Sequence, residues 1–87
     1  MTLTAMLGKL QGIGYSALGN APSAMIIADC LKNLPVKLIK LYRPNGIEIV
    51  FWNALSATQA FEIASIMRGD EYGIYIDEDV VYFWWKP

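Results

Sequence analysis

The spacing of apolar residues in the first third of the chain predicts two short helices. Between residues 2 and 10, leucine and methionine recur at intervals of three, four and seven positions, which places them on one face of a helix. The glycine-rich segment 12–20 then indicates a flexible connection. We expect the second helix to be capped by Asn20, to carry Pro22 in its first turn, and to end at Asn33.

The next pattern is an alternation of side chains in short runs, which is typical of strands. Residues 36–43 and 47–52 flank Pro44-Asn45-Gly46, and this tripeptide has the composition of a tight hairpin turn. A second pair of runs, 72–76 and 80–85, is joined by a short acidic turn. Because hairpin connections are short, the strands within each pair should be antiparallel.

Between the two hairpins, the chain predicts a third helix that ends near Gly69. Ser56 and Gln59 have the spacing of a capping box at its start. Its core face is expected to consist of Ala57, Ala60, Phe61, Ile63, Ala64 and Met67. The order is therefore α-α-β-β-α-β-β. We predict one α+β domain over residues 1–87, with helices packed on one face of a four-stranded antiparallel sheet made of two hairpins.

Side chains alternate between the two faces of a strand, and here both faces are apolar or aromatic. Short helices readily cover one face, so we expect them to cover the one that carries Ile49 and Phe83. In the first strand, the alternation assigns Val36, Leu38, Lys40 and Tyr42 to the other face. An uncovered face rich in Tyr and Trp favours a partner. The predicted partner-binding residues are Tyr42, Val50, Trp52, Tyr75, Tyr82 and Trp84. The alternative is that the N-terminal helix or the glycine-rich segment folds across this face and closes the core.

Charge is distributed unevenly along the chain. Residues 1–45 carry five basic side chains against one acidic, and residues 46–87 carry two against seven. Lys37, Lys40 and Arg43 give the first strand a positive edge, which can guide a charged partner or discourage unwanted strand pairing. Together with the aromatic face, this edge could also bind a single-stranded nucleic acid. Phosphate binding draws on many cations, however, and the formal net charge of the chain is −1.

Composition narrows the chemistry further. Hydrophobic residues make up 55% of the 87 residues and charged residues only 17%. There is no histidine, which excludes the common histidine-based catalytic and metal sites. The single cysteine, Cys30, lies in an apolar run and is predicted to be structural. The acidic run 77–79 is too short to wrap a cation and predicts a solvated turn. We therefore expect no catalytic residue, cofactor or metal site.

The sequence shows no pattern typical of a secretory signal or a membrane-spanning helix. Residues 1–7 carry no basic side chain, and the uncharged stretch 10–28 is interrupted by glycine and proline. The expectation is a cytoplasmic protein without a membrane-spanning segment.

Taken together, these patterns predict a non-catalytic protein–protein interaction module rather than an enzyme. It would be a small adaptor, or an inhibitor of a larger protein of the kind that mobile genetic elements encode, and it would use the aromatic sheet face. Its partner would be another protein, itself, or both, most simply as a two-fold homodimer. The alternative is that the same face binds single-stranded nucleic acid or a small molecule.

Overall fold

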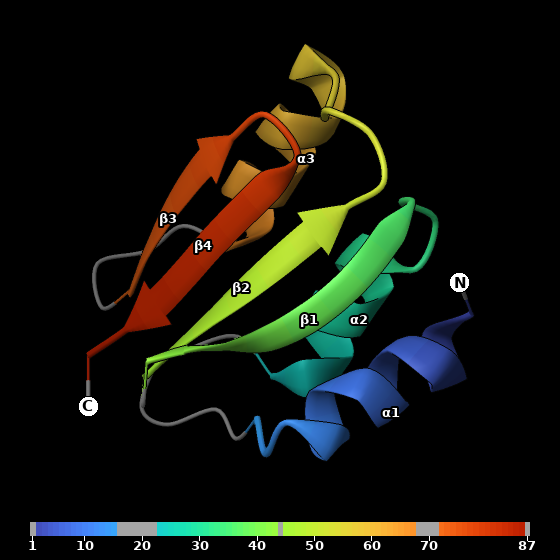
Figure 1. Ribbon diagram of the computed structural model, residues 1–87, viewed down its shortest axis with the longest axis vertical. Helices are drawn as coiled ribbons and strands as arrows, with labels where there is room; N and C mark the ends of the chain where they lie inside the picture. The colour runs from blue at the N-terminus through green and yellow to red at the C-terminus, as the bar shows by residue number, and fades with distance from the viewer. Residues whose placement is uncertain (1, 16–22, 44, 68–71, 87) are drawn as a thin grey trace.

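The computed structural model describes residues 2–15, 23–43, 45–67 and 72–86. In chain order, the elements are α1 (Leu3–Gly12), α2 (Ala24–Leu31), β1 (Val36–Arg43), β2 (Gly46–Phe51), α3 (Ala57–Met67), β3 (Tyr72–Asp77) and β4 (Val80–Trp85). The strands form one antiparallel sheet in the order β1-β2-β4-β3, and the helices lie behind it (Figure 1). The predicted class and element order are confirmed.

Each helix begins at a side chain that accepts a hydrogen bond from its first turn. Thr2 Oγ1 accepts from the Ala5 amide in α1, and Ser23 Oγ accepts from the Ile26 amide in α2. The predicted cap of the second helix is therefore wrong, because Ser23 occupies that position; Asn20 and Pro22 lie outside the described residues. In α3 the capping box is confirmed in both directions between Ser56 and Gln59.

The end of α1 also differs from the prediction. The helix continues to Gly12, so the connection begins later than the glycine pattern indicated. Gly14 follows with a φ of 76°, a left-handed conformation that glycine adopts without a Cβ clash. Tyr15 is then buried, with its ring edge-on to Trp85 at a centroid distance of 5.2 Å. The chain thus leaves α1 on the helix side of the sheet.

The core lies between the helices and one face of the sheet. Ile49 on β2 pairs with Ile39 on β1 and with Val81 on β4, and Phe83 on β4 pairs with Ile74 on β3. The buried apolar residues are Met6, Leu10, Tyr15, Ile27, Ala28, Leu31, Val36, Ile39, Ile47, Ile49, Phe51, Ile63, Val81, Phe83 and Trp85. The helices therefore cover the predicted face.

Val36 belongs to this core and not to the other face. The register of β1 against β2 shifts between Val36 and Leu38, so that Val36 pairs with Phe51 while Leu38 pairs with Val50. Such a bulge places an extra residue, here Lys37, opposite the partner strand and interrupts the alternation. The period-two pattern therefore assigned Val36 to the wrong side.

The predicted core face of α3 was too broad. Ile63 is fully buried and Ala64 is half-buried, but Phe61 is 75% exposed and Ala57 is exposed as well. Ala57 and Phe61 are four residues apart and share one stripe, at the margin of the predicted arc. Because α3 packs mainly against α2 and β3, this margin faces solvent. The side chain of Met67 lies outside the described part of the chain.

The turn of the second hairpin is hydrogen-bonded to the segment between β2 and α3. It consists of Glu78 and Asp79, whose carbonyl oxygens accept hydrogen bonds from the amides of Leu55 and Phe51 at 3.0 and 2.8 Å. Glu78 is exposed and has a φ of 55°, which is unusual for a residue with a side chain. The turn thus anchors the segment that leads from β2 into α3.

This conformation predicts that Glu78→Gly stabilises the protein. A side chain in the left-handed region costs about 1–2 kcal/mol, and the greater flexibility of unfolded glycine offsets part of the relief, so a gain of about 0.5–1 kcal/mol is expected. Urea unfolding followed by circular dichroism measures it. Asp77→Gly is the control, because Asp77 ends an extended strand and glycine there should lower stability by a similar amount. A loss of stability in both variants would contradict the strain at Glu78.

Candidate functional site

The strand side chains that point away from the helices form one continuous surface, which we call the open face. Antiparallel pairing places Lys40, Glu48, Tyr82 and Tyr75 in one row across the sheet, and Leu38, Val50, Val80 and Asp77 in the next. Directly paired residues share a face, so each row lies on one side of the sheet. Tyr42 and Trp84 complete the surface. In Figure 1 this face is turned toward the viewer, in front of the helices.

Aromatic rings form the centre of the open face. The Tyr82 ring lies 5.0 Å from the Tyr42 ring and 6.3 Å from the Tyr75 ring, measured between centroids. Trp84 lies flat over Gly73, since a Cβ built on Gly73 would be 2.6 Å from Cζ2 of the indole. Tyr42 and Tyr75 are 46% and 57% exposed, whereas Tyr82 and Trp84 are half-buried. The three tyrosine rings therefore support one another while offering area to solvent.

Trp52 does not join this cluster. β2 ends at Phe51, one residue earlier than predicted, and Trp52 is 65% exposed just beyond the strand. Its ring lies 5.1 Å from the ammonium nitrogen of Lys37, a cation–π contact. Trp52 follows the last residue of β2 and is four residues along the chain from Glu48, which pairs with Tyr82. Of the six predicted residues, the structure gathers Tyr42, Tyr75, Tyr82 and Trp84, with Val50 beside them.

The positive edge predicted for β1 is largely paired. Lys40 Nζ lies 3.4 Å from a carboxylate oxygen of Glu48, which occupies the same row of the open face. Lys37 packs on Trp52, as described above. The side chain of Arg43 lies outside the described part of the chain. Asp77 adds a second carboxylate at the opposite edge of the sheet, so the described charges of the face and its rim balance.

The N-terminal helix takes the covered side of the sheet. α1 packs against α2, and its Met6 and Leu10 belong to the core. Tyr15, which follows α1, contacts Trp85 on the covered side as well. Within the described ranges, therefore, neither α1 nor the start of its connection covers the open face; residues 16–22 are outside those ranges.

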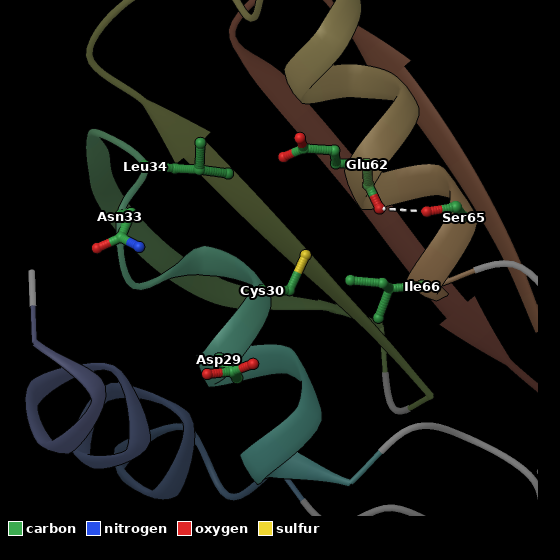
Figure 2. A pocket seen from close by; sticks show the side chains of 7 residues that line it. All are labelled: Asp29, Cys30, Asn33, Leu34, Glu62, Ser65 and Ile66. Atoms are coloured by element: carbon green, nitrogen blue, oxygen red, sulfur yellow. Dashed lines mark hydrogen bonds between the residues drawn. The ribbon is translucent and has the colours of Figure 1, made fainter.

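A separate cleft of about 290 Å³ lies between α2 and α3. Figure 2 shows the Cys30 thiol and the Ile66 side chain pointing toward each other across it, with Asp29 and Glu62 at its sides. Asp29 forms an ion pair with Lys32 at 2.7 Å. The cleft was not predicted; the only signal for it was Ile66, an apolar residue on the polar side of α3.

The surroundings of Cys30 make its thiol a weak nucleophile. Burial raises the pKa of the thiol above its ordinary value, and the carboxylates of Glu62 and Asp29 raise it further. Because the thiolate is the reactive form, the thiol is largely protonated and unreactive at neutral pH. This agrees with the prediction of a structural cysteine, although the residue is half-buried and not fully enclosed.

The raised pKa predicts an alkaline loss of stability. The folded protein holds the thiol proton more tightly than the unfolded chain, so the contribution is complete below the unfolded pKa and is lost as pH rises through the folded pKa. The free energy of unfolding of wild type should therefore fall more steeply at alkaline pH than that of Cys30→Ala, which controls for the titrating tyrosines. Iodoacetamide should also modify folded Cys30 at a higher pH midpoint than the urea-unfolded chain. Equal midpoints would contradict the shift.

The described residues contain no group of three Cys, Asp or Glu side chains placed to hold a metal ion. Among the described helices, none combines the length and apolar character needed to cross a bilayer.

No protein-family model, curated protein or solved structure matches this chain.

Proposed function

We propose that this protein acts without catalysis, by binding another protein through the open face of its sheet. The observation that carries the proposal is the group of three tyrosine rings in contact through Tyr82, together with Trp84 over Gly73, on a face that the described helices leave uncovered. An adaptor or an inhibitor works in this way, because occupying a surface is its whole action.

The cluster has the properties of an interface centre. Tyr and Trp are enriched at the centres of protein interfaces, where they combine a large apolar area with a polar group. The contact of Trp84 with Gly73, and of Tyr82 with its two neighbours, already restricts ring motion. Less conformational entropy is then lost on binding, which favours affinity. Truncation of such central rings often costs 2 kcal/mol or more of binding free energy, roughly a thirtyfold loss.

The charges favour a protein over a nucleic acid as the ligand. Lys40, the cation that the described side chains place on the open face, is already paired with Glu48, and Asp77 adds a carboxylate at the edge. Single-strand binders use a groove of cations that follows the phosphate backbone, and carboxylates on the same face repel it. A face with paired charges and exposed tyrosines suits a protein surface better.

The low reactivity of the Cys30 thiol supports the non-catalytic part of the proposal. Cys30 is the single thiol, and its raised pKa keeps it protonated. Its neighbour Asp29 is engaged by Lys32. Neither residue lies on the open face, so binding there and the cleft between α2 and α3 are separate features of the fold.

Photo-cross-linking in native cells tests the proposal. Benzoylphenylalanine placed at Tyr75 puts a reactive ring on the open face, and the same group at Phe61 puts it on a still more exposed position of α3. We expect defined protein adducts, of a foreign protein or of the chain itself, from position 75 and not from position 61.

Adding Tyr42→Ser to the position 75 probe should reduce those adducts, because it removes a neighbouring ring of the cluster. Identical adducts from both positions would show that the open face is not the binding surface. Adducts to nucleic acid alone, with a mobility shift of labelled single strands at physiological salt, would replace the proposal with its alternative.

A further inference from the structure

The open face carries opposite charges at its two edges. The sheet order β1-β2-β4-β3 makes β1 one edge and β3 the other. β1 contains lysine and arginine but no acidic residue, and β3 contains Asp77 but no basic residue. The turn after β3 adds Glu78 and Asp79 on the acidic side. A surface built in this way is complementary to itself after a half-turn.

We infer that the partner on the open face is a second copy of this chain, related by a two-fold axis parallel to the strands. This rests on the proposed function, of which it specifies the partner. The half-turn brings the two open faces together and exchanges the edges, so that β1 of each copy lies over β3 of the other and β2 lies over β4. Closed two-fold pairs are the commonest assembly of identical chains.

The residue rows match in this arrangement because the axis keeps each residue at its height along the strands. Lys40 of one copy then meets Tyr75 of the second copy, with Asp77 one row away. The ammonium group contacts the exposed tyrosine ring and approaches the carboxylate, both of which attract it. Each contact occurs twice, once at each edge.

The central rows match as well. Val50 of one copy lies over Val80 of the other, which gives the interface an apolar centre. Glu48 lies over Tyr82 of the second copy, whose hydroxyl can donate to the carboxylate. In the third row of these strands, Gly46 lies over Trp84 of the second copy, so no like charges meet along β2 and β4.

A two-fold axis perpendicular to the strands gives the opposite result, because it places β1 over β1 and β3 over β3. The positive edge of one copy then faces the positive edge of the other, and the acidic edge faces the acidic edge. Like charges that face each other oppose association, so the charge pattern favours the axis parallel to the strands.

The size of the face sets the strength of the pair. Four strands about 4.8 Å apart and six residues of about 3.3 Å each give a flat area of about 400 Å² per copy. A standard stable interface buries about 800 Å² per partner, so this pair belongs to the small, transient class. We expect dissociation in the micromolar range and faster exchange at high salt, which screens the edge contacts.

Sedimentation equilibrium of charge-exchanged variants tests both the partner and the arrangement. Lys40→Glu and Asp77→Lys should each weaken self-association by about tenfold or more, because each creates two repulsive edges. An equimolar mixture of the two variants should associate again, since every edge then joins a lysine to a carboxylate. Lys9→Glu and Glu62→Lys make the same charge changes on helices and should leave association unchanged. Circular dichroism confirms that each variant is folded.

The outcomes separate the inference from the function on which it rests. A wild-type protein that remains monomeric up to millimolar concentration overturns the second-copy inference, while adducts of a foreign protein at position 75 would still support the proposed function. A dimer that tolerates both charge exchanges, or a mixture that stays monomeric, overturns the arrangement. Loss of specific adducts at position 75 overturns the function itself.

Discussion

Phe83→Ala is expected to lower the free energy of unfolding by about 3–5 kcal/mol, the range for deleting a fully buried aromatic ring. Phe83 is completely inaccessible, and its ring lies 5.6 Å from that of Trp85. It pairs with Ile47 on one side and with Ile74 on the other, so it links three strands. Domains of this size have a total stability of about 5–15 kcal/mol, so the variant is expected to be largely or partly unfolded at room temperature.

Phe61→Ala is the matched control, because it removes the same ring from a position that is 75% exposed. Surface changes of this kind stay within about 0.5 kcal/mol. Urea unfolding of both variants measures the difference between their free energies of unfolding. The sequence patterns assigned both phenylalanines to the core. Similar losses in the two variants would contradict the packing of α3.

Local signals predicted the elements well because each depends on a few neighbouring residues. The Ser56 and Gln59 capping box is reciprocal in the structure, as the spacing requires. The two hairpins were predicted from short turn sequences, and their strands differ from the expectation by one residue at each end of β2 and by one at the end of β3. These features need no knowledge of the rest of the fold.

Errors arose where a side chain's environment depends on distant packing. Phe61 satisfies the helical period, but which part of the arc is covered depends on where α3 rests against α2 and β3. Val36 satisfies the strand period, but the bulge beside Lys37 moves it to the other face. The strand order was not predictable for the same reason, since β2 pairs with β4 across about 30 intervening residues.

The open face was predicted nearly as the structure has it, with Trp52 as the exception. Alternation is reliable in β4, where no bulge occurs, and it placed Tyr82 and Trp84 correctly on the side away from Phe83. The predicted placement of Trp52 was wrong because β2 ends before it, and the alternation of side chains does not extend beyond the last paired residue. The intramolecular pairing of Lys40 with Glu48 required the register, which the sequence does not specify.

Gly73→Ala is expected to lower the free energy of unfolding by about 1–3 kcal/mol, although alanine is ordinarily the better strand residue. A Cβ at this position would be 2.6 Å from Cζ2 and 2.7 Å from Cε2 of Trp84, well inside van der Waals contact. The indole must move, because Gly73 is held in the ladder opposite Trp84 on β4. The movement should also change the tryptophan fluorescence and displace one ring of the aromatic cluster.

Gly8→Ala separates this steric effect from a general effect of replacing glycine. Gly8 lies inside α1, and nothing lies within 4 Å of the position that its Cβ would take. Alanine there should raise the free energy of unfolding by about 0.5–1 kcal/mol, because it favours the helix and has open space around it. The same substitution is thus expected to lower the free energy of unfolding at Gly73 and to raise it at Gly8. If Gly73→Ala proves as stable as wild type with unchanged fluorescence, Trp84 does not rest on Gly73, and the aromatic cluster lacks the support that makes it a preformed binding surface.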